Sequence, residues 1–268
     1  MSRTRGAWNT KGTWIAGVAL AAVLALTAYS LLAGGDSGSV AAGAAGKGSP
    51  APSVSGSASP DPQYTRPADW TEPERWTALP RGQRTDERGS QVGFPHTVEG
   101  AASMMAVANS TTVEGERSNV DEQLRIYRSY MGPAEQTAEN AVKVEVHGRQ
   151  IDKDLAEQLG VQAGQPLPSG AYLRTHVVGY KVIKKSDDEV SVWLLTRGVT
   201  KPGETKKEEG TYARSLAAAQ WQGGDWKLTA DSTRRALKDI EGQPQPPIVA
   251  PGDAAFNEGG WTAIRAAS

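Results

Sequence analysis

The longest apolar run of the chain extends from Trp14 to Ala33 and reads WIAGVALAAVLALTAYSLLA. It holds twenty residues without a charge, which is about the length of a helix that crosses a ~30 Å hydrocarbon layer. Residues 1–13 carry three basic side chains and no acidic one, whereas the first basic residue after the run is Lys47. The positive-inside rule therefore places residues 1–13 in the cytoplasm and everything after Ala33 outside the membrane.

We expect residues 14–33 to be a transmembrane helix, so that the chain is a single-pass protein of the cell membrane. A cleaved signal peptide is the alternative, because the run ends in the small residues Ala33, Gly34 and Gly35. The run exceeds the apolar core of about 7–15 residues that signal peptides have, which favours the anchor. Both readings place the C-terminal part outside the cytoplasm.

Residues 34–62 predict a disordered linker, because 24 of these 29 residues are Ala, Gly, Ser or Pro and cannot bury enough apolar surface to fold. Gly35-Asp36-Ser37-Gly38 within it resembles the nucleophile motif of chymotrypsin-like proteases. A serine nucleophile needs a rigid base and an oxyanion hole around it. A low-complexity linker offers neither, so we interpret the match as chance.

Residues 63–93 form an arm in which Trp70 and Trp76 recur among prolines and charges. Bare linkers seldom carry two tryptophans, so we expect both indoles to pack onto the domain that follows. The alternative is that the arm docks on a partner protein. Trp70 and Trp76 are therefore candidate protein-contact residues.

Three helices are expected next. Thr97 can cap a helix with small apolar residues at 3- and 4-residue spacings, and Ser118 begins a capping-box pattern for a second helix that ends at Gly132. A third helical stretch covers 134–159, with an interruption or bend near Gly148.

Alternating patterns rich in β-branched and aromatic residues then predict four strands: AYLRTHVVGYKVIK, EVSVWLLTRGV, TYARSLAAAQW and DWKLTA. Short turn sequences join the first to the second and the third to the fourth, which indicates an antiparallel meander. Helices that precede such a sheet give an α+β domain, for which we expect the bounds 94–240.

Apolar residues occur on both sides of the first two strands, so both sheet faces should be buried. Strict alternation places Val178, Tyr180 and Val182 on one face and Leu173, Val177 and Ile183 on the other. The helices can cover one face. A partner subunit, the C-terminal tail or the Trp arm must cover the second.

The tail, residues 241–268, begins with a Pro-rich spacer and ends in a segment that contains Phe256 and Trp261. These side chains are too apolar to stay in water without cost. We expect this end to fold back onto the sheet, with a recognition segment for a neighbouring subunit as the alternative. Phe256 and Trp261 are thus also candidate protein-contact residues.

Composition excludes several kinds of chemistry. The chain has no cysteine, which excludes disulfides, thiolate zinc sites, iron–sulfur clusters and a cysteine nucleophile. Its 29 basic and 30 acidic residues create no field that gathers nucleic acid. His96, His147 and His176 lack metal-ligand spacing. We expect no catalytic residues, no metal, no cofactor and no direct binding to nucleic acid.

Two segments carry a resemblance: Gly93-Phe94-Pro95-His96-Thr97-Val98-Glu99-Gly100-Ala101 and Trp221-Gln222-Gly223-Gly224-Asp225-Trp226-Lys227-Leu228. Three helices, a four-stranded meander and this last hairpin resemble the cone-like nuclear transport factor 2-like fold. With the anchor, the chain resembles the extracytoplasmic subunits of type IV secretion and conjugation machines, including TcpC-like proteins. The first segment is also similar to actinobacterial membrane proteins of unknown function.

The resemblance implies a non-enzymatic membrane scaffold that binds other secretion-complex proteins, with homo-oligomerisation left open. Enzymes of this fold place an acid or a histidine inside the cone, so Asp225 and Asp231 are also of interest. The alternative is a ligand-binding or enzymatic cone whose candidate pocket residues are His176, Tyr180 and Trp193. An accessory protein of a lipid-import system of the Mce-associated kind has a similar layout.

Overall fold

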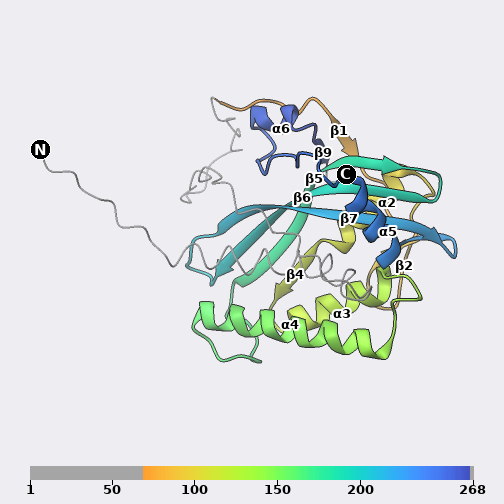
Figure 1. Ribbon diagram of the computed structural model, residues 1–268. Coiled ribbons are helices and arrows are strands. Elements are labelled where there is room, and N and C mark those ends of the chain that lie inside the picture. The colour runs from red at the N-terminus through yellow and green to blue at the C-terminus, as the bar shows by residue number, and fades with distance from the viewer. Residues whose placement is uncertain (1–68, 266–268) are drawn as a thin grey trace, which may run out of the picture.

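The computed structural model describes residues 69–265. Three long strands form the centre of its sheet. They are β5 (Ala171–Lys185), β6 (Glu189–Pro202) and β7 (Glu209–Gln222), paired antiparallel in chain order. A two-residue turn at Gly223 and Gly224 leads into β8 (Asp225–Leu228), and both glycines have positive φ, as tight hairpin turns require. The predicted mixture of helices with a large antiparallel sheet is confirmed (Figure 1).

Short strands widen the sheet beyond the four that the pattern predicted. The outer edge of β5 is shared by β4 (Thr111–Glu114) and β9 (Thr262–Arg265), and β1 (Trp76–Ala78) pairs parallel to β9. The resulting seven-stranded sheet has the order β1-β9-β5-β6-β7-β8, with β4 off this path. The short β2 (Arg84–Thr85) and β3 (Gln91–Val92) form a separate pair.

The predicted N-terminal helices are present, and local capping defines their starts. Thr97 accepts the Gly100 N–H at the start of α2 (Val98–Ala108), and Ser118 forms a capping box at the start of α3 (Asn119–Tyr130). Two C-terminal helices that the pattern did not predict are α5 (Ala230–Asp239) and α6 (Ala254–Glu258).

The third helix, α4 (Ala138–Leu159), is continuous, so the predicted interruption near Gly148 is wrong. Gly148 has a packing role instead. A Cβ at this position would lie 2.9 Å from the Val120 Cα, so the missing side chain lets α3 approach α4 closely. Gly148 therefore marks the point where α3 and α4 cross.

The helices α2 and α3 cover one face of the sheet, which we call the helical face. The largest fully buried side chains of its core are Phe94, Met104, Met105, Tyr127, Tyr130 and Trp226. A smaller cluster of Val113, Ile151, Leu155 and Leu173 attaches α4. Figure 1 shows α3 and α4 along one side of the molecule, with β1, α6 and β9 at the opposite side.

The second face is covered by α5 and by the chain's own C-terminal segment. Phe256 and Trp261 are fully buried there against Trp193, Leu195 and Leu216, and Trp76 packs beside them. The structure thus has the tail folded back onto the sheet, together with part of the arm. The folded unit extends beyond the expected bounds 94–240 in both directions.

Two register shifts in β5 change which residues share a face. They fall between Val177 and Gly179 and between Val182 and Lys184. As a result Val177 and Tyr180 both belong to the helical-face core, whereas Val178 and Ile183 pack on the second face. The assignment from strict alternation is therefore wrong, because each β-bulge inverts the alternation that follows it.

The predicted membrane span, residues 14–33, and the predicted linker, residues 34–62, lie outside the described residues. Within 69–265, no helix is both long and apolar enough to cross a bilayer.

The buried tail gives a stability test. Trp261→Ala removes a fully buried indole and the bond from its Nε1 to the Pro247 carbonyl, so we expect a loss of about 3–5 kcal/mol in unfolding free energy. Denaturant titration measures it. Val142→Ala, at a position that is 57% exposed on α4, serves as the control and should change stability by less than about 0.5 kcal/mol. A loss below about 1 kcal/mol for Trp261→Ala would contradict a tail that belongs to the core.

Candidate functional site

The two segments that carry the family resemblance meet in space. We call this contact between residues 93–101 and 221–228 the hairpin–helix junction. Asp225, which is 4% exposed, accepts the Gly93 N–H on Oδ2 at 2.9 Å and the Phe94 N–H on Oδ1 at 3.0 Å. The carboxylate thus fixes the entry to α2 with two charge-assisted hydrogen bonds.

Trp226 also belongs to the junction. Its indole N–H donates to the Pro95 carbonyl at 2.9 Å, and its ring is fully buried. The same carbonyl lies against α2, since a Cβ added at Gly100 would be 1.9 Å from the Pro95 oxygen. Glycine is therefore the residue that this close approach allows.

His96 closes the junction on the solvent side. Its ring stacks on Trp221 with centroids 4.0 Å apart and meets the edge of Trp226 at 5.5 Å. Its Nε2 lies 3.0 Å from Asp188 Oδ1, and the Asp188 carbonyl accepts the Trp221 N–H. This histidine links the entry to α2 with the end of β7 and with the turn between β5 and β6, which is a structural role.

The candidate pocket residues do not converge. Tyr180 lies on the helical face, and Trp193 lies on the second face beneath Arg214, whose guanidinium carbon is 5.5 Å from the ring centroid. His176 also lies on the second face, but it pairs across the sheet with Arg197, away from Trp193. The three residues line no common space.

The surroundings of His176 are polar and charged. The partial burial of its ring, with the nearby positive charge of Arg197, lowers the pKa of His176 below its usual 6.5, and Glu208 opposes this effect. Glu208 accepts a hydrogen bond from the Tyr172 hydroxyl and lies 3.6 Å from Arg197. These groups neutralise one another.

The candidate protein-contact residues are used within the chain. Phe256 and Trp261 are in the second-face core, with ring centroids 6.4 Å apart. Trp76 packs at the border of this core, under Arg265. Trp70 lies against Gly252, whose φ is +109° and where a Cβ would be 2.4 Å from the indole.

A buried polar network that the pattern analysis missed ties the β2–β3 loop to α3. Glu122, which is 2% exposed, binds Arg125, and Arg125 donates to the Ser90 hydroxyl at 2.8 Å. Asp86 accepts the Ser90 N–H at 2.8 Å and the Ser129 hydroxyl at 2.7 Å. Burial raises the pKa of Asp86, but these hydrogen bonds outweigh it and the pKa is lowered. Asp86 and Ser90 are far from Arg125 and Ser129 in the sequence, so no local spacing pattern predicts this network.

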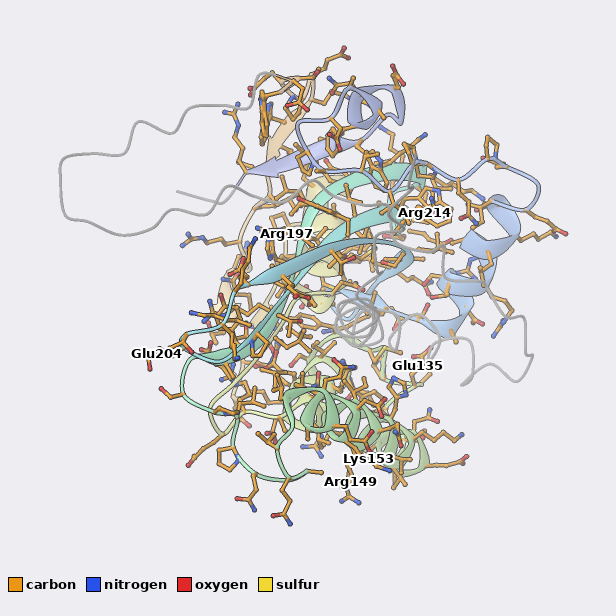
Figure 2. The ribbon with its side chains drawn as sticks, turned by 90° about the vertical axis from the view of Figure 1, so that its left-hand side faces the viewer. Glu135, Arg149, Lys153, Arg197, Glu204 and Arg214 are labelled. Atoms are coloured by element: carbon orange, nitrogen blue, oxygen red, sulfur yellow. The ribbon has the colours of Figure 1, made fainter. Side chains whose placement is uncertain are left out.

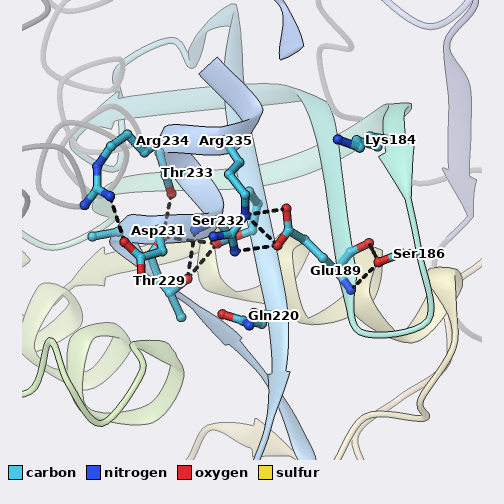
Figure 3. A network of polar contacts seen from close by, with 12 residues as sticks. Lys184, Ser186, Glu189, Gln220, Thr229, Asp231, Ser232, Thr233, Arg234 and Arg235 are labelled. Carbon is cyan, nitrogen blue, oxygen red and sulfur yellow. Dashed lines mark hydrogen bonds and ion pairs between the residues drawn. The ribbon is translucent and has the colours of Figure 1, made fainter. Parts of the chain in front are cut away.

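A second polar network fastens α5 to the sheet (Figure 3). Arg235 binds the Glu189 carboxylate through two of its nitrogens, and Asp231 pairs with Arg234 on the solvent side. Thr229 caps the helix through the Ser232 N–H. Asp231 thus belongs to a surface ion pair on the helix.

Comparisons with known proteins add no assignment. Neither a family model nor a curated protein nor a solved structure matches the chain. Among residues 69–265, no group of three or more His, Asp or Glu side chains is placed to hold a metal ion. The polar side chains described above hold elements of the fold to one another.

The junction predicts a large effect at one carboxylate. Asp225→Ala leaves the Gly93 and Phe94 N–H groups without acceptors, so we expect a loss of about 3 kcal/mol in unfolding free energy. Asp225→Asn keeps one side-chain oxygen as an acceptor and should therefore lose less unfolding free energy. The exposed turn variant Asp187→Ala is the control, and a loss for Asp225→Ala no larger than that control would overturn the role assigned to the carboxylate.

His176 predicts a pH dependence. Its folded-state pKa is lowered, so the unfolded chain takes up the proton first as the pH falls below about 6.5, and stability decreases. His176→Gln should therefore lose less stability than the wild type between about pH 7.5 and pH 5. Denaturant titrations across this range measure the difference. Burial also lowers the pKa of His147, so a double His147→Gln/His176→Gln variant should show a still flatter profile, and unchanged slopes would refute the assignment.

Proposed function

We propose that the chain is a non-enzymatic, single-pass membrane scaffold. Residues 14–33 anchor it, and residues 34–62 carry the α+β domain away from the bilayer on the extracytoplasmic side. Its assembly is a conjugative transfer or type IV secretion-like complex, as the resemblance of residues 93–101 and 221–228 implies.

The observation that carries the proposal is the hairpin–helix junction. Both oxygens of Asp225 accept main-chain N–H groups, and the Trp226 indole binds a main-chain carbonyl. His96 is stacked between an indole and Asp188. The side chains of the two motifs with catalytic potential are thus engaged in holding a rigid shape, which is what a scaffold requires.

The charge distribution supports protein partners rather than nucleic acid. Residues 94–240 hold 19 basic and 20 acidic side chains. Several of the arginines lie in ion pairs, including Arg174 with Glu114 and Arg235 with Glu189. Figure 2 shows Arg197 and Arg214 on the sheet, well apart from Arg149 and Lys153 on α4, so these four cations form no continuous basic track.

Gene deletion in a donor cell tests the proposal. Transfer frequency in conjugation should fall well below that of the parent strain, because the assembly then lacks one of its subunits. The wild-type gene should restore transfer. Unchanged transfer combined with impaired growth on lipid substrates would reject the scaffold in favour of the lipid-import alternative.

The same donor strain tests the anchor. A gene in which residues 1–33 are replaced by a cleavable signal peptide releases the rest of the chain outside the membrane. This version should fail to restore transfer although the protein accumulates, because the anchor sets the place of the domain. Full restoration by the released form would contradict the membrane scaffold.

A further inference from the structure

Two cationic side chains meet over Gly260, which lies between α6 and β9. Arg75 Nη2 and Lys181 Nζ are 3.3 and 3.4 Å from the position that a Cβ of Gly260 would take, so the two nitrogens are at most 6.7 Å apart. Gly260 has a positive φ of +73° and no side chain. It therefore leaves the space in which the two cations come together.

The two cations come from segments far apart in the sequence, which the sheet holds side by side (Figure 1). The Arg75 carbonyl accepts the Ala263 N–H at 2.9 Å, which fixes the arm beside β9. Lys181 lies on β5, and its Nζ donates to the Gly259 carbonyl at 3.0 Å. Both cations are thus positioned by the fold itself, before any ligand binds.

Neither cation forms an ion pair within the part of the chain that the structure describes. Glu74 and Glu258 are the acidic residues nearest in sequence to Arg75 and Gly260, and neither carboxylate pairs with Arg75 or Lys181. Two like charges this close repel each other. An anion that binds both of them removes this unfavourable interaction.

A phosphate group matches the charge and the spacing of this pair. A phosphate monoester carries about −1.5 to −2 charges near neutral pH and has three strong acceptor oxygens. Charge-assisted hydrogen bonds of about 2.8 Å from two sides let one such group bridge both cations. A carboxylate has a single charge and would leave one cation without compensation.

We propose that Arg75 and Lys181 form a binding site for a phosphate monoester group. The group belongs either to the headgroup of an anionic phospholipid, such as phosphatidic acid, or to a soluble phosphate compound. The inference rests on contacts of the described residues alone, so it does not depend on the proposed function.

Lysine labelling tests the site on the full chain in neutral detergent micelles. At constant ionic strength, inorganic phosphate at about ten times its Kd leaves roughly one site in ten free, so acetylation of Lys181 should slow about tenfold. Lys184 is the internal control, because it lies on the same strand but pairs with Asp239 at 3.2 Å. Its rate should not change. Peptide mass spectrometry measures both rates in one sample.

A variant separates a two-cation site from general screening by salt. Arg75→Gln removes one charge-assisted hydrogen bond, so the phosphate concentration that half-protects Lys181 should rise by about tenfold or more. Arg84→Gln removes the same charge from the exposed strand β2 and should leave that concentration unchanged. Circular dichroism checks that both variants fold.

Vesicles distinguish the two sources of the phosphate group. In the reconstituted full chain, phosphatidylcholine vesicles that contain phosphatidic acid should protect Lys181 if the site takes a headgroup, whereas vesicles of phosphatidylcholine alone should not. Protection by inorganic phosphate without protection by phosphatidic acid assigns the site to soluble phosphate compounds. Lys181 acetylation that neither probe slows, or equal half-protection of the wild type and Arg75→Gln, would overturn the proposal.

Discussion

The bond between the Asp225 carboxylate and the start of α2 is the interaction on which the rest of the arrangement depends. It joins the last hairpin to the first helix across most of the folded chain. Once it is formed, Trp226 lies under Pro95 and Gly100 packs onto the Pro95 carbonyl. A buried carboxylate is tolerated here because main-chain donors replace its hydration. The helical-face core, with Met104 and Tyr130, is organised around this contact.

The second constraint is the sheet itself, which is apolar on both faces. Helices cover one face, but the other would expose Trp193 and Leu216 without a cover. The chain uses its own ends for this purpose. Phe256 and Trp261 bury that face, and the parallel pairing of β1 with β9 joins the arm to the tail. The arm that follows the predicted linker is thus joined to the sheet of the domain by β1.

These two constraints shape the functional interpretation. The residues with catalytic potential either hold the junction or lie on different faces, as Tyr180 and Trp193 do. The described surface offers a defined shape and a balanced charge. Such features suit the proposed scaffold, whose partners are other proteins.

The sequence by itself determined what local physics controls. Caps at Thr97 and Ser118, the β-branched and aromatic residues of β6 and the turn at Gly223 and Gly224 involve residues within a few positions of one another, so they are readable without a fold. Only the tertiary structure decided the bulges of β5, the helix α5, the pairing of β1 with β9 and the meeting of the two motifs. Each of these depends on burial and hydrogen bonding between segments far apart in the chain. A pattern of neighbouring residues carries no information about such contacts. For that reason it groups His176, Tyr180 and Trp193 into one candidate pocket, although the structure separates them.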